Sequence, residues 1–250
     1  MSSDIKETLK LLNNFFLINN VNYWLEAGTA LGAYRDGEIM SWDHDMDIAI
    51  WFNERPSIET FNDYFIPLGF DVIVQKGFPF IDNIIQLRVN TTNLRYMDVD
   101  IYLYKEDDEY AYMRWINSPV GSLSGLKQKL LYYLAALYKN NNFMWSLARK
   151  ILSEKFCRYA FKKYLQIHIN TSECIYHRFP KIFFKELKEI NFYDTRVKVA
   201  SKTEEYLAYR YGEGWSVKDK TFNQTGKWKA SQARVRLKMN HLPLPKIDTY

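Results

Sequence analysis

The chain has 250 residues, of which 47% are hydrophobic and 25% are charged, and its formal net charge is +5. This length and composition suit a globular protein with a real core, as one large domain or as a core domain with an appended one. Two cysteines, Cys157 and Cys174, argue against a disulfide framework and a cysteine zinc site. The N-terminus does not resemble a signal peptide, and no apolar run approaches the roughly 18 residues of a membrane span. We therefore expect a cytoplasmic protein.

Hydrophobic periodicity and turn residues divide the chain into two regions. Short strands and helices alternate up to about residue 118, and helical periodicity takes over after Pro119. We therefore predict a small α+β core at residues 1–118 and a mainly helical region with a tail at 119–250. In chain order, the predicted elements are a helix at 4–19, a strand at 23–27, a helix at 29–34, a strand at 45–52, a helix at 56–65, strands at 70–75, 84–89, 96–104 and 111–116, and helices at 123–138, 143–167, 181–190 and 202–211.

Three aspartates on alternate residues lead directly into a buried strand. Asp43, Asp45 and Asp47 are followed by an unbroken apolar run at residues 48–52. Because side chains alternate across a strand, Asp45 and Asp47 are expected to point to one face as a close pair. Two carboxylates that close repel each other unless a cation lies between them. The pattern therefore predicts a divalent metal site.

A second pattern indicates that this site handles phosphate. Gly28 and Thr29 lie where a short strand gives way to a helix, so they offer free backbone N–H groups and a hydroxyl. A metal on the neighbouring strand would meet the same phosphates and neutralise them. Such a site usually needs a third carboxylate, and Asp98 and Asp100, on one face of a later strand, are the candidates.

Two other readings of the aspartates were weighed. In an EF-hand loop the three aspartates would fill the first, third and fifth positions. However, Ile48 lies where the sharp turn needs glycine, and the flanks resemble strand and turn, so we reject the EF-hand.

The DxD motif of nucleotide-sugar glycosyltransferases matches residues 43–45 and 45–47. That fold normally opens with a Rossmann-like series before the motif, and only about forty residues precede it here. A nucleotide-sugar glycosyltransferase stays as the alternative enzyme.

Taken together, these segments resemble the signature of the LicD family, which includes bacterial phosphocholine transferases and fukutin-type ribitol-phosphate transferases. One departure is His44, where many members carry another acid or a tyrosine. The cysteine zinc site of the fukutin-related branch has no counterpart here, which favours the bacterial type. The resemblance is carried by GTALGAYR at residues 28–35, Ile39, WDHDMDI at 42–48, VDIY at 99–102, YLAYRYG at 206–212 and Trp215.

The resemblance implies a nucleotidyltransferase-like catalytic core at 1–118, with the site completed by 119–250. The implied enzyme is a metal-dependent phosphotransferase that moves a phospho-alcohol, such as phosphocholine, from a CDP-activated donor to a hydroxyl of a cell-surface glycan or its precursor. A nucleotidyl-transfer reaction is allowed by the same site. A catalytically inactive binding or scaffold protein is the rival from another class, and the intact aspartates argue against it.

The resemblance also assigns roles to residues of this chain. The donor-binding set would be Gly28 and Thr29 on the phosphates, together with Trp42. Arg35 would stabilise charge on the transferred phosphoryl group or on the leaving CMP, while a simple pairing with Asp36 or Glu38 stays open. The metal, Mg²⁺ or Mn²⁺, would be held by Asp45, Asp47 and Asp100, with Asp100 as a further metal ligand or the base and Asp98 as its substitute.

The basic charge is concentrated in residues 123–166, which hold nine Lys or Arg against the single acid Glu154. No nucleic-acid motif accompanies them, so no nucleic-acid partner is expected. The segment is either a solvated helix face or a peripheral contact with the anionic inner face of the membrane, where a lipid-linked glycan acceptor would be found. Basic and aromatic tail residues are candidates to close over the donor or the acceptor, namely Lys227, Trp228, Lys229, Arg234 and Arg236.

Overall fold

The computed structural model describes residues 2–74, 84–90, 95–116, 173–218 and 234–238, together with 153, 155, 156 and 159. The chain forms two compact units. The first comprises Met1–Gly77, Ile81–Arg114 and Tyr176–Val235, and the second comprises Phe78–Phe80, Trp115–Ile175 and Arg236–Tyr250. The predicted helix at 123–138, nearly all of the one at 143–167 and most of the tail lie outside the described residues.

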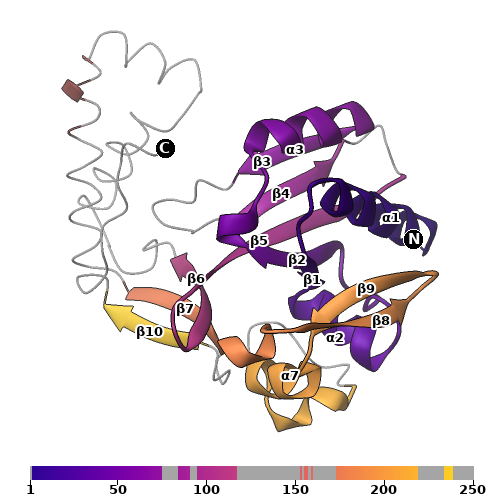
Figure 1. Cartoon of the computed structure of the whole chain (residues 1–250), viewed down its shortest axis with the longest axis vertical. Coiled ribbons are helices and arrows are strands. Elements are labelled where there is room, and N and C mark those ends of the chain that lie inside the picture. The colour runs from indigo at the N-terminus through magenta and orange to yellow at the C-terminus, as the bar shows by residue number, and fades with distance from the viewer. Residues whose placement is uncertain are drawn as a thin grey trace. The chain divides into compact units, whose positions relative to one another are not determined.

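Figure 1 labels most of the helices and strands of the described residues. In chain order they are α1 (Ser2–Ile18), β1 (Tyr23–Leu25), α2 (Ala27–Arg35), β2 (Asp45–Trp51), the 3₁₀ helix η1 (Phe52–Glu54), α3 (Ile58–Phe65), η2 (Ile66–Leu68), β3 (Phe70–Val74), β4 (Ile84–Val89), β5 (Asp98–Glu106), β6 (Tyr110–Ile116), β7 (Glu173–Pro180), η4 (Lys181–Phe183), β8 (Leu187–Phe192), β9 (Thr195–Ala200), α7 (Thr203–Tyr211), η5 (Glu213–Ser216) and β10 (Arg234–Lys238).

A mixed sheet organises these elements. Its main path runs β1-β2-β5-β6-β7-β10, while β4 pairs with both β3 and β5. Strands β2 and β5 are parallel, and the pairs β1–β2, β3–β4 and β4–β5 are antiparallel. A separate hairpin is formed by β8 and β9. The α+β class predicted from the sequence is therefore confirmed.

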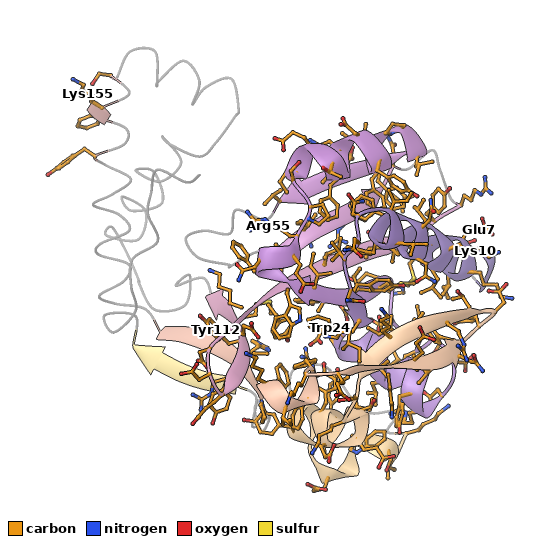
Figure 2. The ribbon with its side chains drawn as sticks, viewed as in Figure 1. Glu7, Lys10, Trp24, Arg55, Tyr112 and Lys155 are labelled. Atoms are coloured by element: carbon orange, nitrogen blue, oxygen red, sulfur yellow. The ribbon has the colours of Figure 1, made fainter. Side chains whose placement is uncertain are left out.

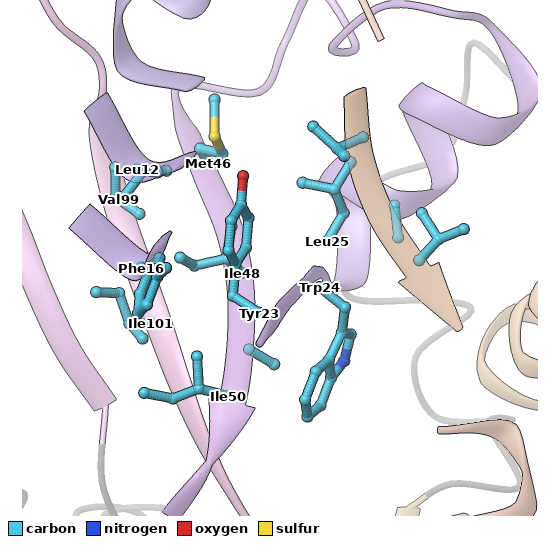
Figure 3. Packing of buried hydrophobic residues seen from close by; sticks show 14 of the residues in the cluster. Leu12, Phe16, Tyr23, Trp24, Leu25, Met46, Ile48, Ile50, Val99 and Ile101 are labelled. Carbon is cyan, nitrogen blue, oxygen red and sulfur yellow. The ribbon is translucent and has the colours of Figure 1, made fainter. Parts of the chain in front are cut away.

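One face of the sheet builds the hydrophobic core. Figure 3 shows Leu12 and Phe16 of α1 beside Ile48 of β2 and Val99 and Ile101 of β5, and all five side chains are buried. Helix α1 contributes Leu12 and Phe16. Its apolar residues recur every three or four positions, so these residues lie on one side of the helix. The opposite side carries charge, such as the exposed pair of Lys10 and Glu7 in Figure 2. The aspartates of β2 and β5 lie on the other face of these strands.

The elements predicted within the first 118 residues are confirmed, with ends that differ by at most two residues, and so is the helix at 202–211. The helix predicted at 181–190 is wrong. Its residues form η4 and the start of β8, which pairs with β9 through a tight turn at Tyr193, where φ is 52°. Pairing with a later strand overrides a helix-compatible pattern here. The division at residue 118 stays a prediction.

Among the described residues, we find no helix that combines the length and the apolar character needed to cross a membrane.

Candidate active site

The parallel register of β2 and β5 gathers four aspartates on the polar face of the sheet. Asp45 lies opposite Asp98, and Asp47 lies opposite Asp100. Residues paired in register point to the same face, and the residues that alternate with these aspartates belong to the core. The structure therefore brings together the carboxylates that the sequence analysis selected, although the two strands are separated by about fifty residues of chain.

Negative charge is concentrated at this face. Burial raises the pKa of Asp45, and the Asp100 carboxylate raises it further. Burial also raises the pKa of Asp47 well above its ordinary range, with added repulsion from Asp45 and Asp43. The pKa of Asp43 is raised to about 6, first by burial and then by Asp45. Keeping these groups ionised costs free energy, and a bound cation would relieve that cost.

The carboxylates of Asp45 and Asp47 suit a cation that is shared with a substrate. Within the described part of the chain, no group of three or more His, Cys, Asp or Glu side chains is arranged as a complete metal site. Asp45 and Asp47 remain as a pair of carboxylates on one strand face. In phosphate-transferring enzymes, Mg²⁺ is typically held by one or two carboxylates, and substrate phosphates and water complete its shell. Two protein carboxylates are therefore a sufficient protein contribution.

The first turn of α2 is fastened to β2 at Asp47. The Glu26 N–H donates to the Asp47 carbonyl over 3.0 Å, and the Asp47 N–H donates to the Thr29 hydroxyl over 2.8 Å. Thr29 is fully buried, so its side chain positions the strand. The N–H groups of Gly28 and Thr29 belong to a first helical turn, whose amides have no acceptor within the helix. Those amides remain the groups of this turn that suit a phosphate.

Gly28 gives the Asp43 carboxylate its place against this helix end. A Cβ added at Gly28 would lie 2.6 Å from Asp43 Oδ2 and 3.3 Å from the terminal carbon of Met40. Only a glycine allows so close an approach without displacing the carboxylate.

Gly28→Ala is therefore expected to weaken Mg²⁺ binding roughly tenfold, because Asp43 must move while the helix itself tolerates alanine. Isothermal titration with MgCl₂ measures the loss. Gly214→Ala is the matched control, since nothing lies within 4 Å of its added Cβ. Unchanged Mg²⁺ affinity in Gly28→Ala would show that the position of the Asp43 carboxylate does not affect metal binding.

Glu26 and Arg210 form a buried ion pair that the sequence analysis did not select. Glu26 is fully buried, and its Oε1 accepts from Arg210 Nη1 at 2.7 Å, from the Tyr206 hydroxyl at 2.8 Å and from the Tyr104 hydroxyl at 2.9 Å. The Tyr206 hydroxyl also accepts from the Ala27 N–H over 3.1 Å. Helix α7 is thus tied directly to the start of α2. The sequence signal that could have pointed to Glu26 is its place as a lone acid directly after the apolar run 23–25.

A tyrosine from β5 orients the more buried of the two paired aspartates. The Tyr102 hydroxyl donates to Asp47 Oδ1 over 3.1 Å. Asp47 is 9% exposed, so little of its side chain is open to solvent. Tyr102 lies within the matched VDIY segment, but no role was predicted for it.

Arg35 is not brought to this site. It is the last residue of α2, about 10 Å along the helix from Gly28. Its Nε and Nη2 donate to the two oxygens of Asp36 over 3.0 and 2.8 Å, and Nη1 donates to the Trp215 carbonyl over 3.3 Å. These contacts hold the pKa of Asp36 below its usual value. They match the pairing with Asp36 that was left open from the sequence.

Trp42 occupies the turn directly before Asp43, and 45% of it is exposed. An indole this exposed has a face available for a flat group. Its predicted place in donor binding stays a prediction.

A small mixed sheet with carboxylates on parallel central strands, beside a glycine-bearing helix start, is a nucleotidyltransferase-like core. Residues 20–121 match the family model described as LicD/FKTN/FKRP, nucleotidyltransferase domain. Over residues 20–121 the chain is therefore similar to the nucleotidyltransferase domain of the LicD family, the family that the sequence motifs resemble.

Curated relatives share parts of the chain. Human ribitol 5-phosphate transferase FKRP is 38% identical over 55 residues, which are 22% of this chain and 11% of FKRP. Human ribitol-5-phosphate transferase FKTN is 23% identical over 233 residues, which are 92% of this chain and 36% of FKTN. An uncharacterized protein of Rickettsia prowazekii is 34% identical over 74 residues, 30% of this chain and 26% of the relative. The chain thus spans little more than a third of these relatives at most.

Among solved structures, the lincomycin-bound lincosamide antibiotic adenylyltransferase LnuA aligns with a TM-score of 0.40 at 14% identity, over 82% of this chain and 85% of that one.

Proposed function

We propose that this protein is a metal-dependent phosphotransferase that moves a phospho-alcohol from a CDP-activated donor to a glycan hydroxyl. The observation that carries the proposal is the parallel pairing that sets Asp45 and Asp47 beside Asp98 and Asp100, next to the first turn of α2. The family domain and the names of the relatives FKRP and FKTN as ribitol-phosphate transferases support it. Phosphoryl transfer needs mainly positioning and charge stabilisation, which this set of groups can supply.

In this proposal each side chain has a defined task. Asp45 and Asp47 bind Mg²⁺ or Mn²⁺, and the metal supplies charge neutralisation at the donor diphosphate. The N–H groups of Gly28 and Thr29 bind phosphate oxygens. The acceptor hydroxyl oxygen forms a new bond to the phosphorus that carries the alcohol, the bond to CMP breaks, and CMP leaves with the electron pair.

The hydroxyl proton goes to a carboxylate of β5. Exposure of the side chain is 38% for Asp98 and 14% for Asp100. Asp98 Oδ1 accepts the Val89 N–H over 2.7 Å, and Arg88 Nε lies 3.8 Å from its Oδ2. Asp100 accepts from both Arg88 and Gln86. Asp98, named as the substitute in the sequence analysis, is therefore the better-placed base.

The acceptor is proposed to be a cell-surface glycan or its lipid-linked precursor at the inner face of the membrane. The basic segment 123–166, nearly all of it outside the described residues, is the proposed contact with anionic lipid.

A thermal-shift panel tests the proposal, with CDP-choline, CDP-ethanolamine, CDP-glycerol and CDP-ribitol each measured with Mg²⁺ and with EDTA. A ligand at a hundred times its dissociation constant should raise the melting temperature by about 5–10 °C in a chain of this size. The rise should require Mg²⁺ and should vanish in Asp45→Asn. Absence of a Mg²⁺-dependent rise with every CDP-alcohol would overturn the proposal, and a rise with UDP-sugars alone would favour the glycosyltransferase. Product mass separates phospho-alcohol transfer from nucleotidyl transfer.

A further inference from the structure

An arginine of β4 lies among the aspartates, and no motif pointed to it. Gln86 of β4 pairs with Asp100 of β5, so Arg88, two residues further on, shares the face of the four carboxylates. Its Nη2 forms an ion pair with Asp100 Oδ1, and its Nε lies 3.8 Å from Asp98 Oδ2. Its charge also opposes the rise in the pKa of Asp45. Arg88 is thus a counter-ion of these carboxylates.

We propose that Arg88 neutralises Asp100 until a divalent cation binds, and that it then turns to the phosphate oxygens of the donor. This inference rests on the proposed function and names a further residue of that site. Asp100 Oδ1 already accepts from Arg88 and from Gln86 Nε2, the latter over 3.0 Å. If a metal on Asp45 and Asp47 takes Asp100 as a further ligand, as the sequence analysis proposed, it needs the same lone pairs. Two cations this close also repel each other, so binding of one favours departure of the other.

The guanidinium is able to make this move. Arg88 is 27% exposed along its side chain, and its third contact, from Nη1 to the Val99 carbonyl, is 3.5 Å long. The group is therefore not held by burial on every side. Its planar fork of N–H donors matches phosphate oxygens in pairs. Arg35 cannot fill this role while Asp36 and the Trp215 carbonyl occupy it.

The alternative is that Arg88 only joins β4 to β5. The two readings predict opposite signs for one measurement. If Arg88 competes with the metal, its removal makes Mg²⁺ bind more tightly to the protein alone. If Arg88 only joins the strands, its removal leaves Mg²⁺ binding unchanged or weakens it.

The test is isothermal titration of MgCl₂ into the full chain, without donor, for the unaltered protein and Arg88→Ala. We expect Mg²⁺ affinity to rise roughly tenfold. In an Asp100→Asn background the same substitution should have little effect, because the competition acts through that carboxylate. Arg196→Ala is the matched control, since Arg196 pairs with Glu189 on the β8–β9 hairpin and is 75% exposed. Arg88→Gln, which keeps a donor to Asp100 without the charge, replaces Arg88→Ala if that variant does not fold.

The second arm is titration of CDP into protein saturated with Mg²⁺, where Arg88→Ala is expected to bind CDP roughly tenfold more weakly. Opposite signs in the two arms support the proposal. Unchanged or weaker Mg²⁺ affinity in both charge-removing variants overturns it. The metal arm uses no donor, so it stays informative even if no CDP-alcohol is a substrate. Failure of the proposed function and failure of this inference are thereby distinguished.

Discussion

Arg210→Met is expected to lower the free energy of unfolding by about 3–5 kcal/mol. The substitution keeps an apolar side chain of similar length but leaves Glu26 without its cation. Glu26 is fully buried and Arg210 is 5% exposed, so water cannot replace the lost partner. The hydroxyls of Tyr104 and Tyr206 would remain on Glu26 but carry no compensating charge. Urea denaturation followed by circular dichroism measures the loss.

Two controls isolate the buried charge as the cause. Adding Glu26→Gln to Arg210→Met removes the stranded carboxylate, so the double variant should recover part of the lost stability. Arg196→Met removes an exposed partner of Glu189 and should cost less than about 1 kcal/mol. If Arg210→Met costs no more than Arg196→Met, the pair contributes little to stability, and α7 must be held to the core by its apolar contacts.

The central strands could be predicted because their signals are local. Asp45 and Asp47 alternate with Met46 and Ile48, and the same alternation recurs around Asp98 and Asp100. The pattern of each strand therefore predicts which side chains share a face. No sequence pattern stated that the two strands are parallel neighbours in this register. That information lies in the packing of the sheet, and the family resemblance supplied the expectation.

The parts of the site that were missed depend on contacts between distant segments. Glu26 and Arg210 are separated by 184 residues, and Arg88 meets Asp100 only because β4 and β5 pair. Arg35 illustrates the converse case. Its motif suggested a role in catalysis, yet the adjacent Asp36 offers two acceptors at no cost in chain ordering, and the guanidinium takes them.

The helix predicted at 181–190 shows the same limit for secondary structure. Charged and apolar residues alternate there in a way that fits a helix face or a strand edge. The hydrogen bonds of β9 decide between them, because a strand left unpaired at that position would leave its backbone groups unsatisfied.

Asp47→Asn is expected to reduce phospho-alcohol transfer by roughly a thousandfold or more while the protein stays folded. The amide keeps an oxygen that can accept from the Tyr102 hydroxyl, so the local hydrogen bond survives. What is lost is the negative charge that, with Asp45, would hold the cation. Transfer assayed by product mass and Mg²⁺ binding measured by isothermal titration should fall together. Retained transfer would remove Asp47 from the metal site.

The same variant should melt at a higher temperature than the unaltered protein when no metal is present. Burial raises the pKa of Asp47 well above its unfolded value, so the folded state binds the proton more tightly than the unfolded state. The stability that this group contributes is present at low pH and is lost as pH rises through the folded pKa. Asparagine carries no such penalty, so the difference in melting temperature should widen as pH rises above the unfolded pKa of Asp47. Asp63→Asn, at an exposed position of α3, should show no such widening. A variant that loses stability at every pH would mean that the Asp47 charge is already compensated without metal, and the case for a cation at this pair would fail with it.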